Sequence, residues 1–221
     1  MAKPRSKARL LAEIAAASRQ CQACPLYASA TQTVFGDGPA SAPLMLVGEQ
    51  PGDEEDQEGL PFVGPAGRLL RRALEEATID PATVYLTNVV KHFKWKPGAG
   101  WKRLHQKPNR REVSACLPWL EQEVALVHPA LIVTLGSTAG QALLGAGVRV
   151  TRDRRSLRRW GDHPVMIGVH PSSVLRARDS ASRQTQYLDL VGDLEAAAAF
   201  LRQEPNATDG DHDHRAGSHA R

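Results

Sequence analysis

Polar groups that could act on a ligand follow directly after short apolar runs of this sequence. Glu49 and Gln50 follow the first run, and Gly48 before them lets a ligand approach the backbone closely. Asn88 ends a second run, and its amide could pair with the edge of a base flipped out of a nucleic acid. An Asn that only caps the end of a strand would occupy the same position. His170 follows a later run and could donate a hydrogen bond to a leaving-group oxygen.

Further groups lie beside these positions in the sequence. Phe62 brings an aromatic ring that could stack on a base or anchor the core. Asp53 opens a run of five carboxylates in residues 53–58, which predicts a solvated loop, with a Mg²⁺ site as the alternative. Ser172 and Arg176, behind the histidine, could hold a phosphate or order a turn.

The residues Trp-Lys-Arg-Leu-His at 101–105 form the centre of a basic segment. Lys102 and Arg103 precede His105, and repulsion between like charges is expected to lower the pKa of its imidazole. A neutral imidazole can act as a base or a nucleophile near pH 7. The alternative is a loop histidine that only contacts phosphate.

The chain has three cysteines, an odd number that argues against a closed set of disulfides. Cys21 and Cys24 form a Cys-x-x-Cys pair, Cys116 stands alone, and His92 is the best-placed fourth ligand. Three cysteines and one histidine suit structural zinc or an iron–sulfur cluster, and the donor types do not separate the two. Cys116 could also be a small buried apolar residue.

The composition is typical of a globular protein. Of the 221 residues, 42% are hydrophobic and 24% are charged. No stretch approaches the roughly 18 apolar residues of a membrane span. The first twenty residues include basic ones but lack the apolar core of a secretory signal. We therefore expect neither a membrane protein, nor a secreted disulfide scaffold, nor a wholly disordered chain.

The positive charge is concentrated in two segments. Residues 91–111 hold eight Lys or Arg and no acid, and residues 152–159 hold five Arg and one Asp. The chain has 28 basic and 24 acidic residues, so 15 basic and 23 acidic residues remain elsewhere, a balance of −8. This distribution is typical of a polyanion-binding surface, although two solvated basic loops would give the same pattern.

Strand-like and helix-like segments alternate along the chain. Strands are expected at 44–48, 83–90, 130–135 and 164–169, and helices at 6–18, 65–77, 111–127, directly after Gly136, and at 183–202. Residues 91–110 are expected to form a long basic loop. The alternation predicts an α/β fold, in which helices cover both faces of a mainly parallel, four-stranded sheet. Ligands of such folds bind beyond the carboxyl ends of the strands, where the polar groups described above lie.

Four motifs together resemble the uracil-DNA glycosylase superfamily over roughly residues 10–200. They are Gly-Glu-x-Pro-Gly after the first strand, Leu-Pro-Phe-Val-Gly-Pro-Ala-Gly, Thr-Asn at the end of the second strand, and His-Pro-Ser after the fourth. Cys21, Cys24 and Cys116 resemble ligands of the family 4 enzymes, in which four cysteines hold a [4Fe–4S] cluster. The histidine at position 92 and the basic loop resemble the uracil-DNA glycosylase X branch, whose loop ends in Lys-Arg-Arg-Ile-His. This chain departs from that motif with Trp-Lys-Arg-Leu-His but keeps the terminal histidine.

The resemblance implies a three-layer α/β/α sandwich and an enzyme that cleaves the N-glycosidic bond of deoxyuridine in DNA, with single strands favoured. In the X branch the loop histidine bonds to the sugar C1′ after uracil has left, which implies the same for His105. The implied catalytic residues are His105, Glu49, His170 and Asp53, and the implied substrate-binding residues are Gly48, Gln50, Phe62, Asn88, Ser172, Arg176, Lys102 and Arg103. The implied ligands of a structural [4Fe–4S] cluster, with zinc as the alternative, are Cys21, Cys24, His92 and Cys116.

Two other functions remain open on the sequence. A conventional glycosylase would hydrolyse the same bond, release free uracil and turn over. A non-catalytic metalloprotein would bind single-stranded DNA through the two basic segments. We expect a monomer in a bacterial cytoplasm that meets the nucleoid when it acts. Residues 1–203 are expected to form one glycosylase-like domain that includes the metal subsite, and 204–221 a disordered tail.

Overall fold

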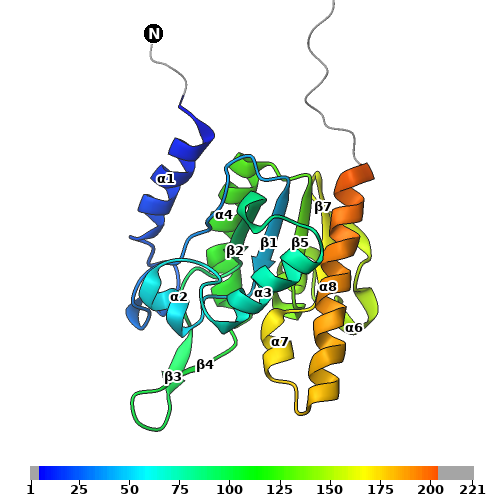
Figure 1. Cartoon of the computed structure of the whole chain (residues 1–221). Coiled ribbons are helices and arrows are strands. Elements are labelled where there is room, and N and C mark those ends of the chain that lie inside the picture. Colours follow the sequence, from blue (N-terminus) through cyan, green and yellow to red (C-terminus); the bar gives the residue numbers. More distant parts are fainter. Residues whose placement is uncertain (1–4, 204–221) are drawn as a thin grey trace, which may run out of the picture.

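A mostly parallel, five-stranded sheet forms the centre of the computed structural model, which describes residues 5–203 (Figure 1). The strand order is β2-β1-β5-β7-β6, with bounds β1 Leu44–Gly48, β2 Val84–Asn88, β5 Leu131–Leu135, β6 Leu157–Trp160 and β7 His163–Gly168. Neighbouring strands are parallel except β6, which pairs with β7 in the antiparallel direction. The predicted disordered tail, 204–221, lies outside the described residues.

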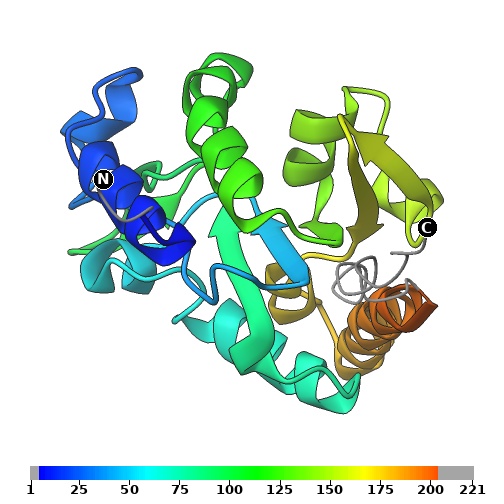
Figure 2. The ribbon, with the colours of Figure 1, turned by 90° about the horizontal axis from the view of Figure 1, so that it is seen from above.

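Helices cover both faces of the sheet and give the three layers visible in Figure 2. They are α1 Lys7–Ser18, α2 Asp53–Glu58, α3 Pro65–Glu76, α4 Arg110–Val127, α5 Ser137–Leu144, α6 Val150–Asp153, α7 Pro171–Leu175 and α8 Ser180–Gln203. Among the described residues, no helix is both long enough and apolar enough to cross a membrane.

The two faces of β1 build two separate cores. Leu44 and Leu46 pack with residues of α3 and α8, whereas Met45 and Val47 pack with residues of α1, α4 and α5. Successive side chains of a strand point to opposite faces, so a strand covered on both sides needs a continuous apolar run. This requirement explains the run in β1, and the predicted three-layer α/β fold is confirmed.

Three elements differ from the sequence predictions. β6 is a fifth strand that the prediction of four omitted, because this edge strand is exposed and its arginines hide any apolar pattern. The predicted basic loop contains an antiparallel hairpin, β3 Trp95–Pro97 and β4 Arg103–His105, whose strands are too short to show a period. The carboxylate run 53–58 forms helix α2 instead of a loop.

The strand registers bring the polar groups to one edge of the sheet. Gly48 pairs with Asn88, and Leu135 pairs with Gly168. The segments that follow β1, β2, β5 and β7 therefore emerge side by side, at the carboxyl ends of the parallel strands.

Candidate active site

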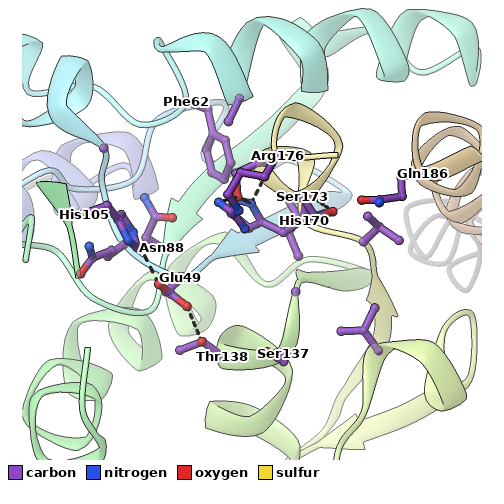
Figure 3. A pocket seen from close by; sticks show the side chains of 18 of the residues that line it. Glu49, Phe62, Asn88, His105, Ser137, Thr138, His170, Ser173, Arg176 and Gln186 are labelled. Atoms are coloured by element: carbon purple, nitrogen blue, oxygen red, sulfur yellow. Dashed lines mark hydrogen bonds and ion pairs between the residues drawn. The ribbon is translucent and has the colours of Figure 1, made fainter. Parts of the chain in front are cut away.

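A pocket of about 850 Å³ opens at this edge of the sheet (Figure 3). Its lining includes Glu49, Phe62, Asn88, His105 and His170, which come from five separate segments of the chain. Gln50, Ser172 and Arg176 also line it. The expected residues Asp53, Lys102 and Arg103 are not part of this lining.

Asn88 presents a buried acceptor to this pocket. The side chain is only 2% exposed, and among the described residues its Oδ1 has no hydrogen-bond partner. A Cβ atom added to Gly48 would come within 2.3 Å of this oxygen and 2.8 Å of Cζ of Phe62, so only glycine fits there. Because an unpaired buried oxygen is costly, the position suits a ligand that donates an N–H group.

Phe62 is held in an unusual backbone conformation beside that acceptor. Its φ angle is +56°, a region that bulky residues rarely adopt, and such outliers cluster at ligand sites. A Cβ atom on Gly67 would meet the carbonyl oxygen of Phe62 at 1.7 Å, so this glycine lets α3 approach closely. The ring centroids of Phe62 and His170 lie 6.5 Å apart.

Glu55 ties the first motif to the segment that follows Phe62. Its carboxylate accepts the backbone N–H groups of Gly52 at 3.0 Å and Gly64 at 2.8 Å. Glu55 and Asp56 are buried, so part of the acidic run is structural and the prediction of a solvated loop is wrong. The glycine followed three residues later by a glutamate was the available signal, since this spacing is typical of a helix N-terminus.

His170 is held as a neutral hydrogen-bond donor. Its Nδ1 accepts the backbone N–H of Ser172 at 3.1 Å, and the Ser172 hydroxyl accepts from Arg176 at 2.9 Å. Burial, followed by the charge of Arg176 and the neighbouring His105, lowers the pKa of His170 to about 4. A neutral ring whose Nδ1 is an acceptor carries its proton on Nε2.

His105 ends β4 and faces Glu49 across the pocket (Figure 3). Its Nε2 lies 3.5 Å from Oε1 of Glu49, and the other carboxylate oxygen accepts the hydroxyl of Thr138. Burial lowers the pKa of His105 most, Glu49 raises it, and Arg176 lowers it. The predicted direction is therefore confirmed, but burial and Arg176 cause it and not the cations that precede the histidine in sequence.

Arg103 and Gln50 hold the hairpin that carries His105. The guanidinium of Arg103 pairs with Asp53 and, at 2.6 Å, with Asp56. The Gln50 amide donates to two backbone carbonyl oxygens at the base of the hairpin, at 3.1 and 3.2 Å. The mutual contact of Arg103 and Asp53 fixes the hairpin, and the substrate contact of Arg103 and the catalytic role of Asp53 stay predictions.

The two basic segments differ in how much of their charge is free. In residues 152–159, four of the five arginines form ion pairs with two buried aspartates, Asp153 and Asp193. Lys102 in the hairpin is exposed. The hairpin is therefore the better candidate for a polyanion contact.

Two buried ion pairs that the sequence analysis missed hold the strand ends. Lys91 Nζ donates to Glu123 at 2.5 Å and to the backbone oxygen of Asn88 at 2.8 Å. In the second pair, Asp193 binds Arg154 at 3.0 Å and also accepts the N–H of Val169, the residue before His170, at 2.9 Å. The available signal for Glu123 was its place on the buried stripe of α4. Lys91 and Glu123 are 32 residues apart in sequence, so no local pattern connects them.

The cysteines share one neighbourhood. Cys24 and Cys116 belong to the same apolar cluster, in which Trp119 also packs and donates to the sulfur of Cys21 at 3.2 Å. The backbone N–H of Lys91 donates to the sulfur of Cys116 at 3.1 Å. Three sulfurs, two of them accepting N–H groups, fit the donor chemistry of an iron–sulfur cluster.

The geometry does not yet form a complete metal site. Among the described residues, no three His, Cys, Asp or Glu side chains converge closely enough to hold a metal ion. His92 is buried, and this burial lowers the pKa of its imidazole, although nearby Asp56 partly opposes the shift. The expected ligand set therefore stays a prediction.

Comparison with known proteins agrees with this architecture. The family model of the uracil DNA glycosylase superfamily matches residues 35–195. A type-4 uracil-DNA glycosylase of Thermotoga maritima is 36% identical over 188 residues, which cover 84% of this chain and 92% of that protein. Type-4 enzymes of Pyrobaculum aerophilum and Archaeoglobus fulgidus are 40% and 33% identical, over 57% and 70% of this chain and 60% and 78% of their own lengths. The chain belongs to the uracil-DNA glycosylase superfamily.

Proposed function

We propose that this protein excises uracil from DNA, with single strands favoured, and then stays covalently bound to the sugar C1′ through His105. The observation that carries the proposal is the pocket in Figure 3, where a buried free acceptor, an aromatic ring and a neutral imidazole surround one space that His105 also faces. The relatives named type-4 uracil-DNA glycosylases support the excision activity.

The acceptor, the ring and the imidazole match the outline of uracil. Oδ1 of Asn88 would accept the N3–H group of the base, and Phe62 would stack on its face. When the bond between C1′ and uracil N1 breaks, its electron pair stays with uracil and negative charge develops on the ring oxygens. The Nε2–H of His170 would donate to such an oxygen, where a fixed dipole stabilises the developing charge.

His105 would complete the reaction on the sugar. Its pKa is lowered, so at neutral pH the imidazole has one unprotonated nitrogen whose lone pair can bond to C1′. The bond to C1′ leaves an imidazolium, whose remaining N–H proton can pass to Glu49. When Glu49 releases that proton and the uracil anion gains one, Glu49 is again ionised, uracil is neutral, and the exchange balances. Thr138 holds the second oxygen of Glu49 and thereby keeps its first oxygen near the ring. Fixed proximity gives the histidine an advantage over water.

We also propose that Cys21, Cys24, His92 and Cys116 hold a [4Fe–4S] cluster with a structural role. When bound, the cluster would join the N-terminal segment, the residues after β2 and helix α4. Lys91 supports this role, because its backbone contacts Cys116 while its side chain holds Asn88. The chain's own residues perform every step of the excision described above.

A denaturing gel tests the covalent step. Protein is mixed with a labelled single-stranded oligonucleotide that carries one uracil, and the mixture is boiled in detergent. We expect a slowly migrating band that is absent with thymine in place of uracil and absent with His105→Ala. His163→Ala is the matched control, because this histidine begins β7 at the opposite end of the strand from the pocket, and it should keep the band.

The other outcomes assign the other functions. Strand breakage after alkali without a stable band would indicate a hydrolytic glycosylase that releases free uracil, and would overturn the role of His105. If neither a band nor strand breakage is seen, the excision activity is overturned, and a DNA-binding protein is the remaining function.

A further inference from the structure

The β3–β4 hairpin presents one indole with no cover from the protein. The hairpin projects away from the body of the molecule (Figure 1), and Trp101 in its turn has a relative exposure of 102%. The backbone N–H of Gly98 donates to the oxygen of Lys102 at 2.8 Å, and Gly100 has a φ of +64°, so the turn is closed beneath the indole. A single exposed apolar side chain is common on protein surfaces, but an indole at the tip of a projecting hairpin offers an open ring face for stacking.

The surroundings of Trp101 are cationic. Lys96, Lys102 and Lys107 are exposed, and residues 91–111 contain no carboxylate. Glu112, the next residue, pairs with Lys94. Near the hairpin, Asp53 and Asp56 are already paired with Arg103. The free charge of the projecting tip is therefore positive, so the tip attracts a polyanion.

The hairpin register separates two faces. Trp95 pairs with His105, and Lys96 pairs with Leu104, so His105 and Arg103 lie on one face and Leu104 on the other. Lys102 is two residues from Leu104 and shares its face. A strand that delivers a nucleotide to His105 from the tip would therefore pass the indole at the end of the hairpin, while the lysines on the opposite face add positive potential to the same tip.

The indole and lysines together fit single-stranded DNA. Base stacking on aromatic side chains and a positive groove along the backbone are how proteins bind single strands without reading their sequence. The stacking face of a base is available only when its neighbour has moved away, and bases inside a duplex are covered on both faces. The occupant that fits Trp101 is therefore an unpaired base of the strand that carries the uridine.

The chain length between Trp101 and His105 limits which base this is. His105 is four positions after Trp101, and only the last three residues of this segment are in β4, so the two Cα atoms are at most about 13 Å apart. Stacked nucleotides of one strand are about 3.4 Å apart and unstacked ones farther, so the base lies about two to four nucleotides from the uridine. We propose that Trp101 stacks on an unpaired base at this distance and gives the enzyme its preference for single strands. The inference rests on the proposed function, in which the pocket beside His105 holds the uridine.

Binding to uracil-free DNA tests the stacking apart from the chemistry. The dissociation constant is measured by fluorescence anisotropy with a single-stranded thymine oligonucleotide at several salt concentrations. We expect Trp101→Ala to raise it roughly 5- to 100-fold, the span of base–aromatic stacking, and Trp101→Phe to restore most of the affinity. The salt dependence should not change, because no charge is lost, whereas Lys102→Gln should reduce its slope by about one. Leu188→Ala, which removes an exposed apolar side chain on α8, is the matched control and should have no effect.

Oligonucleotide length and strandedness test the position. The difference in affinity between wild type and Trp101→Ala should vanish on DNA so short that it ends one nucleotide on either side of the base in the pocket. The difference should also be absent on a duplex. Equal affinity of the two proteins for a long single strand would overturn the inference, even if the wild type excises uracil normally. Loss of affinity in Trp101→Ala without any uracil release by the wild type would retain the stacking contact and overturn the proposed function.

Discussion

Asp193→Asn tests whether a buried ion pair on α8 positions His170. The carboxylate of Asp193 is 1% exposed and accepts from Val169 N–H at 2.9 Å, from Arg154 Nη2 at 3.0 Å and from Arg155 Nε at 2.9 Å. Asparagine has the same shape, but it carries no charge and one of its two ends is an NH₂ donor. At least one of these donors would then face another donor.

The expected loss of stability follows from the burial. Removing one partner of a buried ion pair costs about 3–5 kcal/mol. Arg154 keeps a second ion pair with Asp189 at 2.9 Å and is partly exposed, so we expect the lower end, about 3 kcal/mol. A loss of 1 kcal/mol lowers the Tm of a protein of this size by roughly 2–4 °C. The expected fall in Tm is therefore about 6–12 °C.

The expected loss of activity follows from the contact with Val169. This residue directly precedes His170, and the misplacement of a catalytic group by 1 Å can cost about 10²-fold in rate. We expect uracil release by Asp193→Asn to slow by about 10- to 100-fold. Both proteins are compared in single-turnover reactions at a temperature well below their melting points, so that the variant is folded.

Asp153→Asn is the matched control. Asp153 is also buried and also pairs with arginines, but its bonds do not reach the residues around His170. It should lower the Tm and change the rate of uracil release much less. An Asp193→Asn protein with a lowered Tm but a wild-type rate would refute the positioning role, and an unchanged Tm would refute the energetic reasoning.

Three further predictions concern other parts of the site. The folded pKa of His170, about 4, lies below its ordinary value of 6.5, so protons bind more tightly to the unfolded chain between these pH values. The stability that this difference provides is complete above pH 6.5 and is lost as the pH falls toward 4, by up to about 3 kcal/mol. In urea unfolding across this pH range, the free energy of unfolding should therefore fall less for His170→Asn than for the wild type. Glu55→Gln should lower the Tm and weaken uracil excision, because an amide cannot accept both the Gly52 and the Gly64 N–H groups through two oxygens; equal excision by this variant and the wild type would refute its role in joining the two segments. Cys116→Ser should lower the iron content of anaerobically purified protein, whereas equal iron in both proteins, or zinc in its place, would contradict the proposed cluster.

The sheet and its large helices could be predicted because each leaves a local pattern. Residues 44–48 form a continuous apolar run since β1 is covered on both faces, and the structure has the strand at the predicted residues. Helices α1, α3, α4 and α8 begin and end within a few residues of their predicted bounds. The rule that ligands bind beyond the carboxyl ends of parallel strands then located Glu49, Asn88 and His170 at one edge.

The elements that were missed leave no such pattern. α2 has six residues, β3 and β4 have three each, and β6 is an exposed edge strand with arginines. Segments this short or this polar do not contain a full apolar period, so their conformation depends on what they pack against. The hairpin is held by Arg103 and Gln50, whose partners lie 44 to 56 residues away in sequence.

The sequence by itself determined the fold class, the positions of the main strands and helices along the chain, and about a third of the residues that line the pocket. The tertiary structure decided which charges are free and which are paired, because ion-pair partners such as Lys91 and Glu123 or Arg154 and Asp193 are brought together only by folding. It also changed the reason for the lowered pKa of His105, since burial and distant Arg176 act on the ring. Apolar periodicity is a local property of the chain, whereas burial and electrostatic partners depend on contacts between distant segments.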